Sequence, residues 1–143
     1  MNKNILTALL LLMVVTLTAC FEEKDQTFKG PLQVEFPLAS RTKTVGATAK
    51  VDSIKVQMIG AQQAADLEGN FTVLTTGTTA VEGVDYTLST PGKFVVPANS
   101  NFGYIVVNLP VTGKASVLKL ELADSDKLKA SVNYKTLTYN IKP

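Results

Sequence analysis

Short stretches in which apolar and polar residues alternate recur along the chain after residue 30, and turns rich in Gly, Pro, Asn and Thr separate them. The clearest alternation runs over residues 51–59, where Ile54, Val56 and Met58 are interleaved with polar side chains. A period of two places successive side chains on opposite faces of a strand, so one face is buried and the other meets water. Turn signals every eight to twelve residues or so are typical of β-sandwiches. The pattern therefore predicts an all-β domain.

The remaining strands follow the same pattern. Residues 102–111 are apolar on both faces, which is typical of a central strand or of one whose outer face meets something else. Pro37 cannot donate to a ladder, so residues 32–36 are predicted to form an edge strand or the end of one. Tyr134 falls on the opposite parity from Leu137, which predicts a bulge or an outward tyrosine. We expect about seven strands in one two-sheet sandwich, over residues 32–36, 41–49, 51–59, 70–75, 80–88, 93–96, 102–111, 117–122 and 132–141, not all of them independent.

An apolar segment precedes the strands. Lys3 supplies a positive charge, and residues 5–17 are apolar apart from two threonines. As a helix this run reaches about 20 Å at ~1.5 Å per residue, which is short of the ~30 Å hydrocarbon core of a bilayer. The run therefore predicts a signal-peptide core instead of a permanent membrane span.

The signal ends at Leu17-Thr18-Ala19-Cys20, which contains the only cysteine of the chain. This motif resembles the lipobox of bacterial lipoproteins. The resemblance implies cleavage between Ala19 and Cys20, a diacylglycerol thioether on the Cys20 sulfur, and a fatty acid such as palmitate on its freed amine. A thiol suits this step because it is nucleophilic near neutral pH. The alternative is an ordinary signal peptide that happens to contain a cysteine.

Three segments follow from this interpretation: a signal peptide over residues 1–19, a flexible tether over 20–31 and an immunoglobulin-like sandwich over 32–143. The acidic start of the tether, Phe21-Glu22-Glu23-Lys24-Asp25-Gln26, resembles the surface-export signal of lipoproteins from the Bacteroidota. A solvated tether is the simpler alternative. We expect an outer-membrane lipoprotein of the cell envelope, held at the membrane through its N-terminal lipid and exposed at the surface.

Composition narrows the function. The 14 Lys and Arg and the 12 Asp and Glu are interspersed, with no basic stripe, so nucleic acid is not an expected partner. Histidine is absent, which removes the commonest general base and transition-metal ligand. With Cys20 lipidated, Ser-His-Asp, Cys-His and zinc-cluster chemistries are not expected either. Tryptophan is absent too, which weakens a simple carbohydrate-stacking interpretation. We expect a protein that is not an enzyme and has no cofactor.

Part of the chain, about residues 45–143, resembles the Calx-beta domain, and more closely small envelope lipoproteins of the Bacteroidota. The genes of these lipoproteins often accompany starch-utilisation-type glycan uptake systems. The motifs are mostly structural, so they imply an immunoglobulin-like fold and no particular activity. They are residues 82–86 (EGVDY), 94–97 (FVVP), 105–109 (IVVNL) and 118–122 (LKLEL).

Within the first motif, Gly83 is expected to supply a turn position with positive φ, Asp85 to cap that turn, and Tyr86 to plug the end of the sandwich. Calx-beta domains that bind calcium use acidic residues after the long strand and at the C-terminal end. Neither stretch contains a carboxylate here, and calcium needs six to eight oxygen ligands. Asp124 and Asp126 are therefore expected to lie in a solvated loop, and no metal site is predicted.

Four residues are candidate surface sites. Phe102, Tyr104 and Tyr134 are the aromatic candidates for contact with an extended polar ligand, and core packing is the alternative for each. Asp52-Ser53-Ile54 matches a bacterial O-glycosylation sequon, which makes Ser53 a candidate acceptor, although three residues match often by chance.

Three functions remain open. The leading hypothesis is a lipid-anchored, non-catalytic module, accessory to the binding of a surface glycan or an outer-membrane protein. The alternative is a structural subunit of a surface assembly that pairs through the exposed edge of residues 32–36. The distant alternative is a carboxylate-based glycoside hydrolase, for which Glu82 and Asp85 are the nearest acidic pair.

Overall fold

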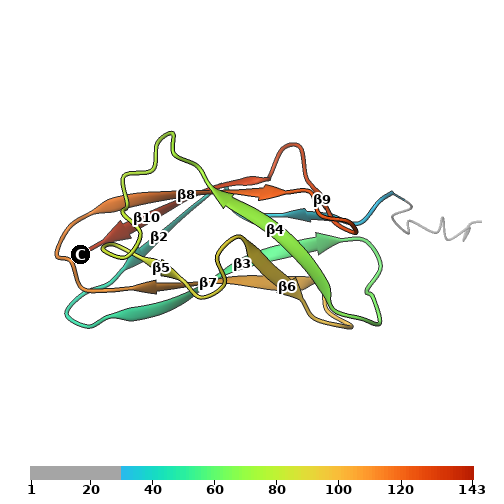
Figure 1. Cartoon of the computed structure of the whole chain (residues 1–143), viewed down its shortest axis with the longest axis horizontal. Coiled ribbons are helices and arrows are strands. Elements are labelled where there is room, and N and C mark those ends of the chain that lie inside the picture. Colours follow the sequence, from blue (N-terminus) through green and yellow to red (C-terminus); the bar gives the residue numbers. More distant parts are fainter. Residues whose placement is uncertain (1–29) are drawn as a thin grey trace, which may run out of the picture.

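Ten β-strands and no helix make up the described part of the chain, residues 30–143, in this computed structural model (Figure 1). The all-β prediction is confirmed, but the strand count is ten and not about seven. Only β9, with two residues, lies outside the predicted ranges, because so short a strand shows no alternating pattern. The strands are β1 (Gln33–Glu35), β2 (Ser40–Thr44), β3 (Lys50–Ile59), β4 (Leu67–Val73), β5 (Thr87–Leu88), β6 (Lys93–Val96), β7 (Phe102–Leu109), β8 (Ser116–Ala123), β9 (Lys129–Ala130) and β10 (Thr136–Lys142).

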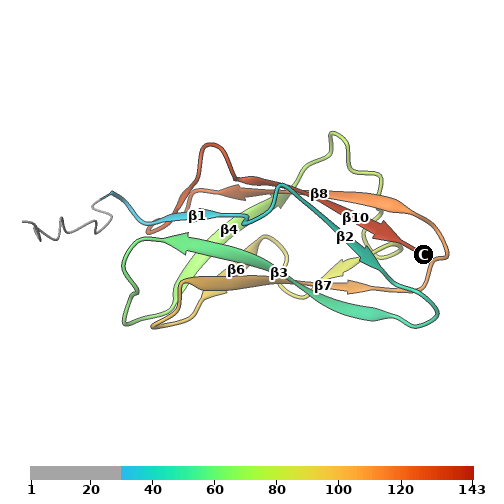
Figure 2. The ribbon, with the colours of Figure 1, turned by 180° about the vertical axis from the view of Figure 1, so that it is seen from behind.

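The strands form two five-stranded sheets that pack as a sandwich (Figure 1). The first sheet has the order β5-β7-β3-β1-β9 and the second β2-β10-β8-β4-β6. The longest pairing joins β3 to β7, antiparallel, from Lys50 opposite Leu109 to Gln57 opposite Phe102. The crossing from β1 to β2 takes the chain from the first sheet to the second at Pro37 (Figure 2).

The core lies between the two sheets and consists of the apolar positions of the alternating strands. The predicted inward side chains of residues 51–59, 117–122 and 132–141 are all buried, so this part of the prediction is confirmed. Each alternating strand supplies every second residue to the same layer, as period two requires. These side chains are Ile54, Val56, Met58, Leu118, Leu120, Leu122, Leu137, Tyr139 and Ile141.

Of the two alternatives for residues 32–36, the edge strand is wrong, and the end of a strand before Pro37 is confirmed. β1 pairs with β3 on one side and with β9, in parallel, on the other. The returning chain adds two further hydrogen bonds, from the Ser131 N–H to the Val34 carbonyl (2.9 Å) and from the Phe36 N–H to the Tyr134 carbonyl (2.8 Å). Pro37 stands beyond the end of the strand, so its missing N–H says nothing about the outer side of β1.

The strands at the true edges offer little surface for pairing with another chain. β5 and β9 have only two residues each. β2 directs two cations, Arg41 and Lys43, toward the carboxylate of Asp52 in the first sheet. β6 lies against β7, with the Val95 carbonyl close to Gly103. Short edges, inward charges and covered edges are the devices that limit edge-to-edge association.

Two details of the turns follow the sequence. Gly83 has a φ of +82°, and Tyr86, at 3% exposure, is buried at that end of the core, as predicted. Tyr134 lies before β10 begins, and it is 55% exposed. Of the two alternatives predicted for Tyr134, the outward tyrosine is therefore correct and the bulge is not.

The two ends of the described chain lie at opposite ends of the sandwich (Figures 1 and 2). Gly30 leads into β1, and the C-terminus lies beyond the far end of β10. The predicted signal peptide, its cleavage site at Ala19 and Cys20, and most of the predicted tether fall outside residues 30–143. Within those residues no helix is long and apolar enough to span a bilayer.

Candidate ligand-binding groove between the two sheets

An open groove of about 620 Å³ lies where β6 of the second sheet meets β7 of the first. It is the place where one of the predicted contact residues, Tyr104, borders a concave surface. Protein ligand sites commonly enclose about 300–1,000 Å³, so its size suits a small ligand. Its lining residues are Glu68, Ser89, Thr90, Pro91, Lys93, Phe94, Val95 and Tyr104.

The close approach of β6 and β7 depends on Gly103. A Cβ at this position would lie 2.6 Å from the Val95 carbonyl oxygen and 3.0 Å from the Phe94 ring. Only a residue without a side chain fits there, because real contacts of a Cβ are longer. Gly103 therefore brings the outer edge of β6 against β7, and Tyr104 follows it at the border of the groove.

The groove is open because β5 ends early. The hydrogen bond from the Ser89 N–H to the Val106 carbonyl (3.1 Å) is the last backbone hydrogen bond of this segment with β7. The chain then turns away through Pro91 and Gly92, which has a φ of +77°. Proline and a glycine with positive φ are the residues that such a tight turn requires. Residues 102–105 of β7, which include Tyr104, are consequently left uncovered by β5.

The walls combine apolar and charged groups. The Tyr104 side chain is 49% exposed and stands on the outer face of β7, beside Pro91 and the 47% exposed Val95. At the rim, Lys93 Nζ lies 2.6 Å from Glu68 Oε1, and both side chains are more than half exposed. The groove thus offers a flat aromatic surface next to a hydrogen-bond donor and an acceptor.

Phe102, the second aromatic candidate, does not line this groove. The Lys55 ammonium lies 3.5 Å from the centroid of its ring, which is a cation–π contact on the outer face of the first sheet. Because Lys55 covers the ring, Phe102 makes a contact within the domain. The sequence pattern alone could not distinguish such a contact from one with a ligand.

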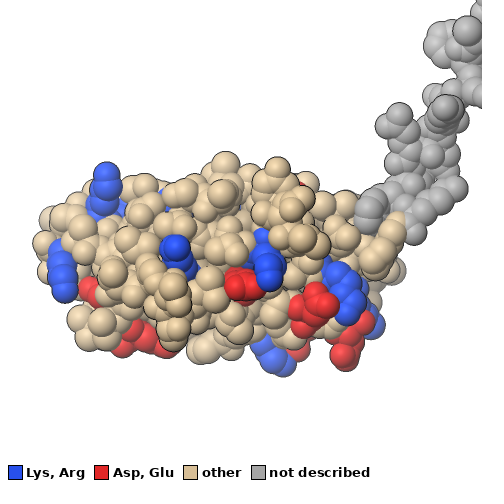
Figure 3. All heavy atoms as spheres, turned by 90° about the horizontal axis from the view of Figure 1, so that it is seen from above, with Lys and Arg blue, Asp and Glu red and all other residues tan. Residues whose placement is uncertain are grey.

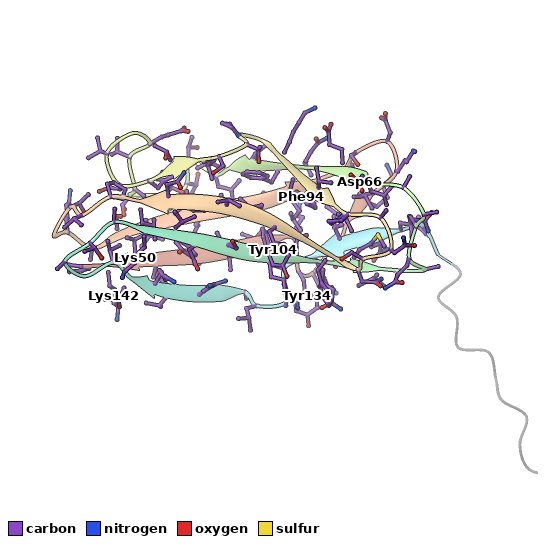
Figure 4. The ribbon with its side chains drawn as sticks, turned by 90° about the horizontal axis from the view of Figure 1, so that it is seen from below. Lys50, Asp66, Phe94, Tyr104, Tyr134 and Lys142 are labelled. Carbon is purple, nitrogen blue, oxygen red and sulfur yellow. The ribbon has the colours of Figure 1, made fainter. Side chains whose placement is uncertain are left out.

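Tyr134, the third candidate, lies at the opposite side of the same sheet (Figure 4). Its carbonyl pairs with the N–H of Phe36, so β1 and β3 stand between it and Tyr104. Three strand spacings of ~4.8 Å separate the two residues by roughly 15 Å. Phe102 and Tyr104 are therefore neighbours on the outer face of β7, Tyr134 lies apart from both, and of the three only Tyr104 lines the groove.

A buried ionic cluster joins the sheets on the other side of the sandwich. Asp52 of β3 is 7% exposed and accepts hydrogen bonds from the Tyr139 hydroxyl (2.7 Å), Arg41 (2.9 Å) and Lys43 (3.2 Å). Burial raises the pKa of Asp52, but the hydrogen bonds from Tyr139 and Lys43 and the charge of Arg41 outweigh it, and the pKa lies below its usual value. Burial and the neighbouring Asp52 carboxylate raise the pKa of Tyr139.

Sequence reasoning missed this cluster, although a signal was present. Asp52 shares the parity of Ile54 and Val56, so period two placed a carboxylate on the buried face of the clearest strand. Arg41 and Lys43 alternate in the same way along β2. A buried carboxylate needs a partner, and these two cations were the nearest basic residues that share one strand face.

The acidic loop after β8 is held by its own contacts. Asp124 Oδ1 accepts the Ala130 N–H (2.9 Å), and its Oδ2 lies 3.1 Å from Lys129 Nζ. The Ala130 hydrogen bond and the Lys129 contact hold the pKa of Asp124 below its usual value. Asp126 lines a hollow of about 290 Å³ together with Asp66 and with Glu68, which also lines the groove. In residues 30–143 no three acidic, His or Cys side chains converge as metal ligands would.

The acidic pair considered for glycoside hydrolysis serves the turn before β5. Asp85 is 4% exposed, and its Oδ2 accepts the Val81 N–H at 2.8 Å, so it caps the turn as predicted. Glu82 lies on the outside of the turn and raises the pKa of Tyr86, together with the larger effect of burial. At 4% exposure the Asp85 carboxylate offers little surface to a substrate.

Ser53 lies on the outer face of β3 and is exposed. Its carbonyl accepts a hydrogen bond from Arg41 (3.0 Å). O-glycosylation of its hydroxyl stays a prediction.

Charged side chains are interspersed over the surface. On the face shown in Figure 3, Lys and Arg alternate with Asp and Glu, without a broad area of one sign. Within residues 30–143, two of the five ion pairs join side chains that are both more than half exposed, Lys129 with Asp124 and Lys93 with Glu68. On this face the structure shows no stripe of basic side chains.

No protein-family model matches the chain, and no curated protein matches its sequence. Among solved structures, the chain is similar to the apo form of the Calx CBD1 domain, with a TM-score of 0.58 and 14% identity over 79% of this chain and 97% of that chain. It is also similar to CBD12 from CALX1.2, with a TM-score of 0.57 and 13% identity, and to the calcium binding domain CBD12 of CALX1.1, with a TM-score of 0.55 and 12% identity.

The chain is covered to 77% and 76% in the two CBD12 comparisons, and it spans 43% and 44% of those longer chains. At these identities the similarity shows the fold alone. The described part of the chain is a Calx-beta-like, immunoglobulin-like sandwich, and this part of the sequence prediction is confirmed.

Proposed function

We propose that the chain is a lipid-anchored, non-catalytic binding module of a bacterial cell envelope, of the kind found in Bacteroidota lipoproteins. Cys20 carries the lipid, residues 20–31 are the tether, and the sandwich is displayed at the surface of the outer membrane. The module is accessory to the binding of a surface glycan or an outer-membrane protein. The observation that carries the binding role is the groove of about 620 Å³ beside the half-exposed Tyr104.

The geometry of the acidic residues supports a non-catalytic role. Asp85 is buried and bonded to the Val81 N–H, and Asp124 is bonded to the Ala130 N–H. The groove contains one carboxylate, Glu68, which is paired with Lys93. A glycoside hydrolase needs two carboxylates that face one bond, and the groove offers one.

The blunt sheet edges support binding over the assembly of fibres. β1, the strand on which the assembly hypothesis depended, already has β9 beside it. Pairing with another chain is favoured by a long open edge. A soluble domain that stays monomeric at high concentration is the corresponding expectation, checked by sedimentation.

The test compares the wild-type protein with Cys20→Ser in the native bacterium. Wild type is expected in the outer-membrane fraction, where protease added to intact cells digests it, and Cys20→Ser is expected to lose membrane retention. Tyr104→Ala should stay in the membrane and remain accessible to protease but lose ligand binding. Tyr134→Ala should keep the membrane retention, the protease accessibility and the ligand binding. Equal membrane retention of wild type and Cys20→Ser would contradict the anchor, and protease resistance on intact cells would contradict surface display.

A further inference from the structure

We propose that the Tyr104 groove binds one ring of a neutral glycan, with the Tyr104 ring stacked on the sugar and the Lys93–Glu68 pair holding two adjacent hydroxyls. This inference rests on the proposed function and names its ligand class and the role of each contact. A pyranose ring is apolar on the faces formed by its C–H groups and polar around its rim. The groove presents the complementary arrangement.

The apolar side of the site is a tyrosine flanked by small apolar residues. Tyr104 leaves about half of its surface in water, and Val95 does the same at 47% exposure. Together with Pro91 they form one side of the groove. A rigid aromatic ring gives a large contact area with few rotatable bonds, and a bound sugar face would remove that area from water.

The polar side is the Lys93–Glu68 pair. Its Nζ and Oε1 are 2.6 Å apart, and both side chains are more than half exposed. An ammonium only donates hydrogen bonds, and a carboxylate only accepts them. Two neighbouring sugar hydroxyls match this spacing, because one accepts from Lys93 while the next donates to Glu68. Such charge-assisted hydrogen bonds are stronger than bonds between neutral groups.

Two features select among ligands. The charges of Lys93 and Glu68 compensate each other, so an acidic sugar gains at the ammonium and loses at the carboxylate. An extended peptide would bind such a site by adding a strand to β7. Beyond the end of β5, only residues 102–105 of β7 keep an unpaired edge, and four residues offer a short site for strand addition. The observations therefore favour a neutral sugar over both.

The experiment titrates the unlipidated mature chain, residues 20–143 with Cys20→Ser, with linear gluco-, manno- and galacto-trisaccharides, and follows the backbone amides by NMR. At least one trisaccharide should shift amides of Val95 and Tyr104. Tyr104→Ala should weaken its binding at least about tenfold, equivalent to about 1.4 kcal/mol. Tyr104→Phe should stay within about twofold, because the ring and not the hydroxyl makes the contact. Glu68→Gln should weaken binding about fivefold or more, as expected for the loss of a charged acceptor.

Tyr134→Ala is the matched control, since this tyrosine is equally exposed and lies across the sheet; its affinity should equal that of the parent. The inference is overturned if no neutral trisaccharide binds at about 20 mM, a concentration at which even weak ligands are detected. It is also overturned if Tyr104→Ala binds the sugar as well as the parent does, or if a glucuronate trisaccharide binds more tightly than every neutral one. A peptide that shifts the same amides would overturn the sugar assignment and leave the proposed binding function standing. Absence of a lipid on Cys20 would remove the anchor and leave the sugar assignment standing.

Discussion

Replacing the buried carboxylate of Asp52 by an amide should destabilise the fold more than the same change at an exposed ion pair. In Asp52→Asn the side chain keeps its size, but the negative charge that faces Arg41, Lys43 and the Tyr139 hydroxyl is lost. The amide also directs a donor group toward two cations. The variant therefore removes the charged link between β3 of one sheet and β2 and β10 of the other.

The magnitude follows from burial. A hydrogen bond to a charged group contributes about 1.5–3 kcal/mol, and removing one partner of a fully buried pair costs about 3–5 kcal/mol. Arg41 and Lys43 are one-third exposed, at 33% and 32%, so water takes over part of their solvation when the carboxylate is lost. We expect a loss of about 2–3 kcal/mol in the free energy of unfolding.

Glu68→Gln is the matched control. Its partner Lys93 lies closer, at 2.6 Å, than either cation lies to Asp52, but both side chains are more than half exposed. Exposed ion pairs contribute at most about 1 kcal/mol, so this variant should lose less than about 0.5 kcal/mol. The comparison separates burial from distance, because distance alone would predict the opposite order.

Urea unfolding followed by circular dichroism and tyrosine fluorescence measures both variants, and the absence of tryptophan leaves the tyrosine signal clear. The pH dependence gives a second test. Because the pKa of Asp52 is below its unfolded value of about 3.9, its contribution is complete above about pH 4 and is lost as the pH falls through the folded pKa. Wild type should therefore lose more stability below about pH 4 than Asp52→Asn. Equal losses in Asp52→Asn and Glu68→Gln, or parallel acid profiles, would refute the reasoning.

Three further substitutions test other parts of the structure by the same urea assay. Gly103→Ala should cost about 1–3 kcal/mol, because its Cβ would lie 2.6 Å from the Val95 carbonyl; an unchanged midpoint would contradict the close approach of β6. Asp85→Ala should cost about 1–2 kcal/mol, since it leaves the Val81 N–H without its acceptor; Asp126→Ala, in the exposed loop, is its control and should cost under about 0.5 kcal/mol. Tyr104→Ala should lose less than about 1 kcal/mol, because half of its side chain is already in water; a larger loss would show that its main duty is packing.

The long strands were predictable because burial and period two act together. Ile54, Val56 and Met58 had to share one face, and the structure buries all three. Gly83 was predictable for a local reason, since its turn needs a positive φ. In both cases the physical cause lies within a few residues of the position.

The groove and the edges were not predictable in the same way, because they depend on contacts between distant segments. β1 is covered by β9, which follows it by more than ninety positions, and no local pattern of residues 32–36 records that pairing. Gly103 marks a close approach of β6 that only the packed sheets reveal. Tyr104, Phe102 and Tyr134 looked alike in the sequence, and their different surroundings come from distant segments: Lys55 of β3 covers the Phe102 ring, and Pro91 and Val95 lie beside Tyr104.

The central claim, an anchored module that binds and does not catalyse, depends first on Cys20. Intact mass spectrometry of the protein purified from its native membrane tests it most directly. The account predicts a mature chain that begins at Cys20 and carries a diacylglycerol thioether and an N-terminal acyl chain. A mature chain with a free Cys20 thiol, or one released into the medium without lipid, would contradict it.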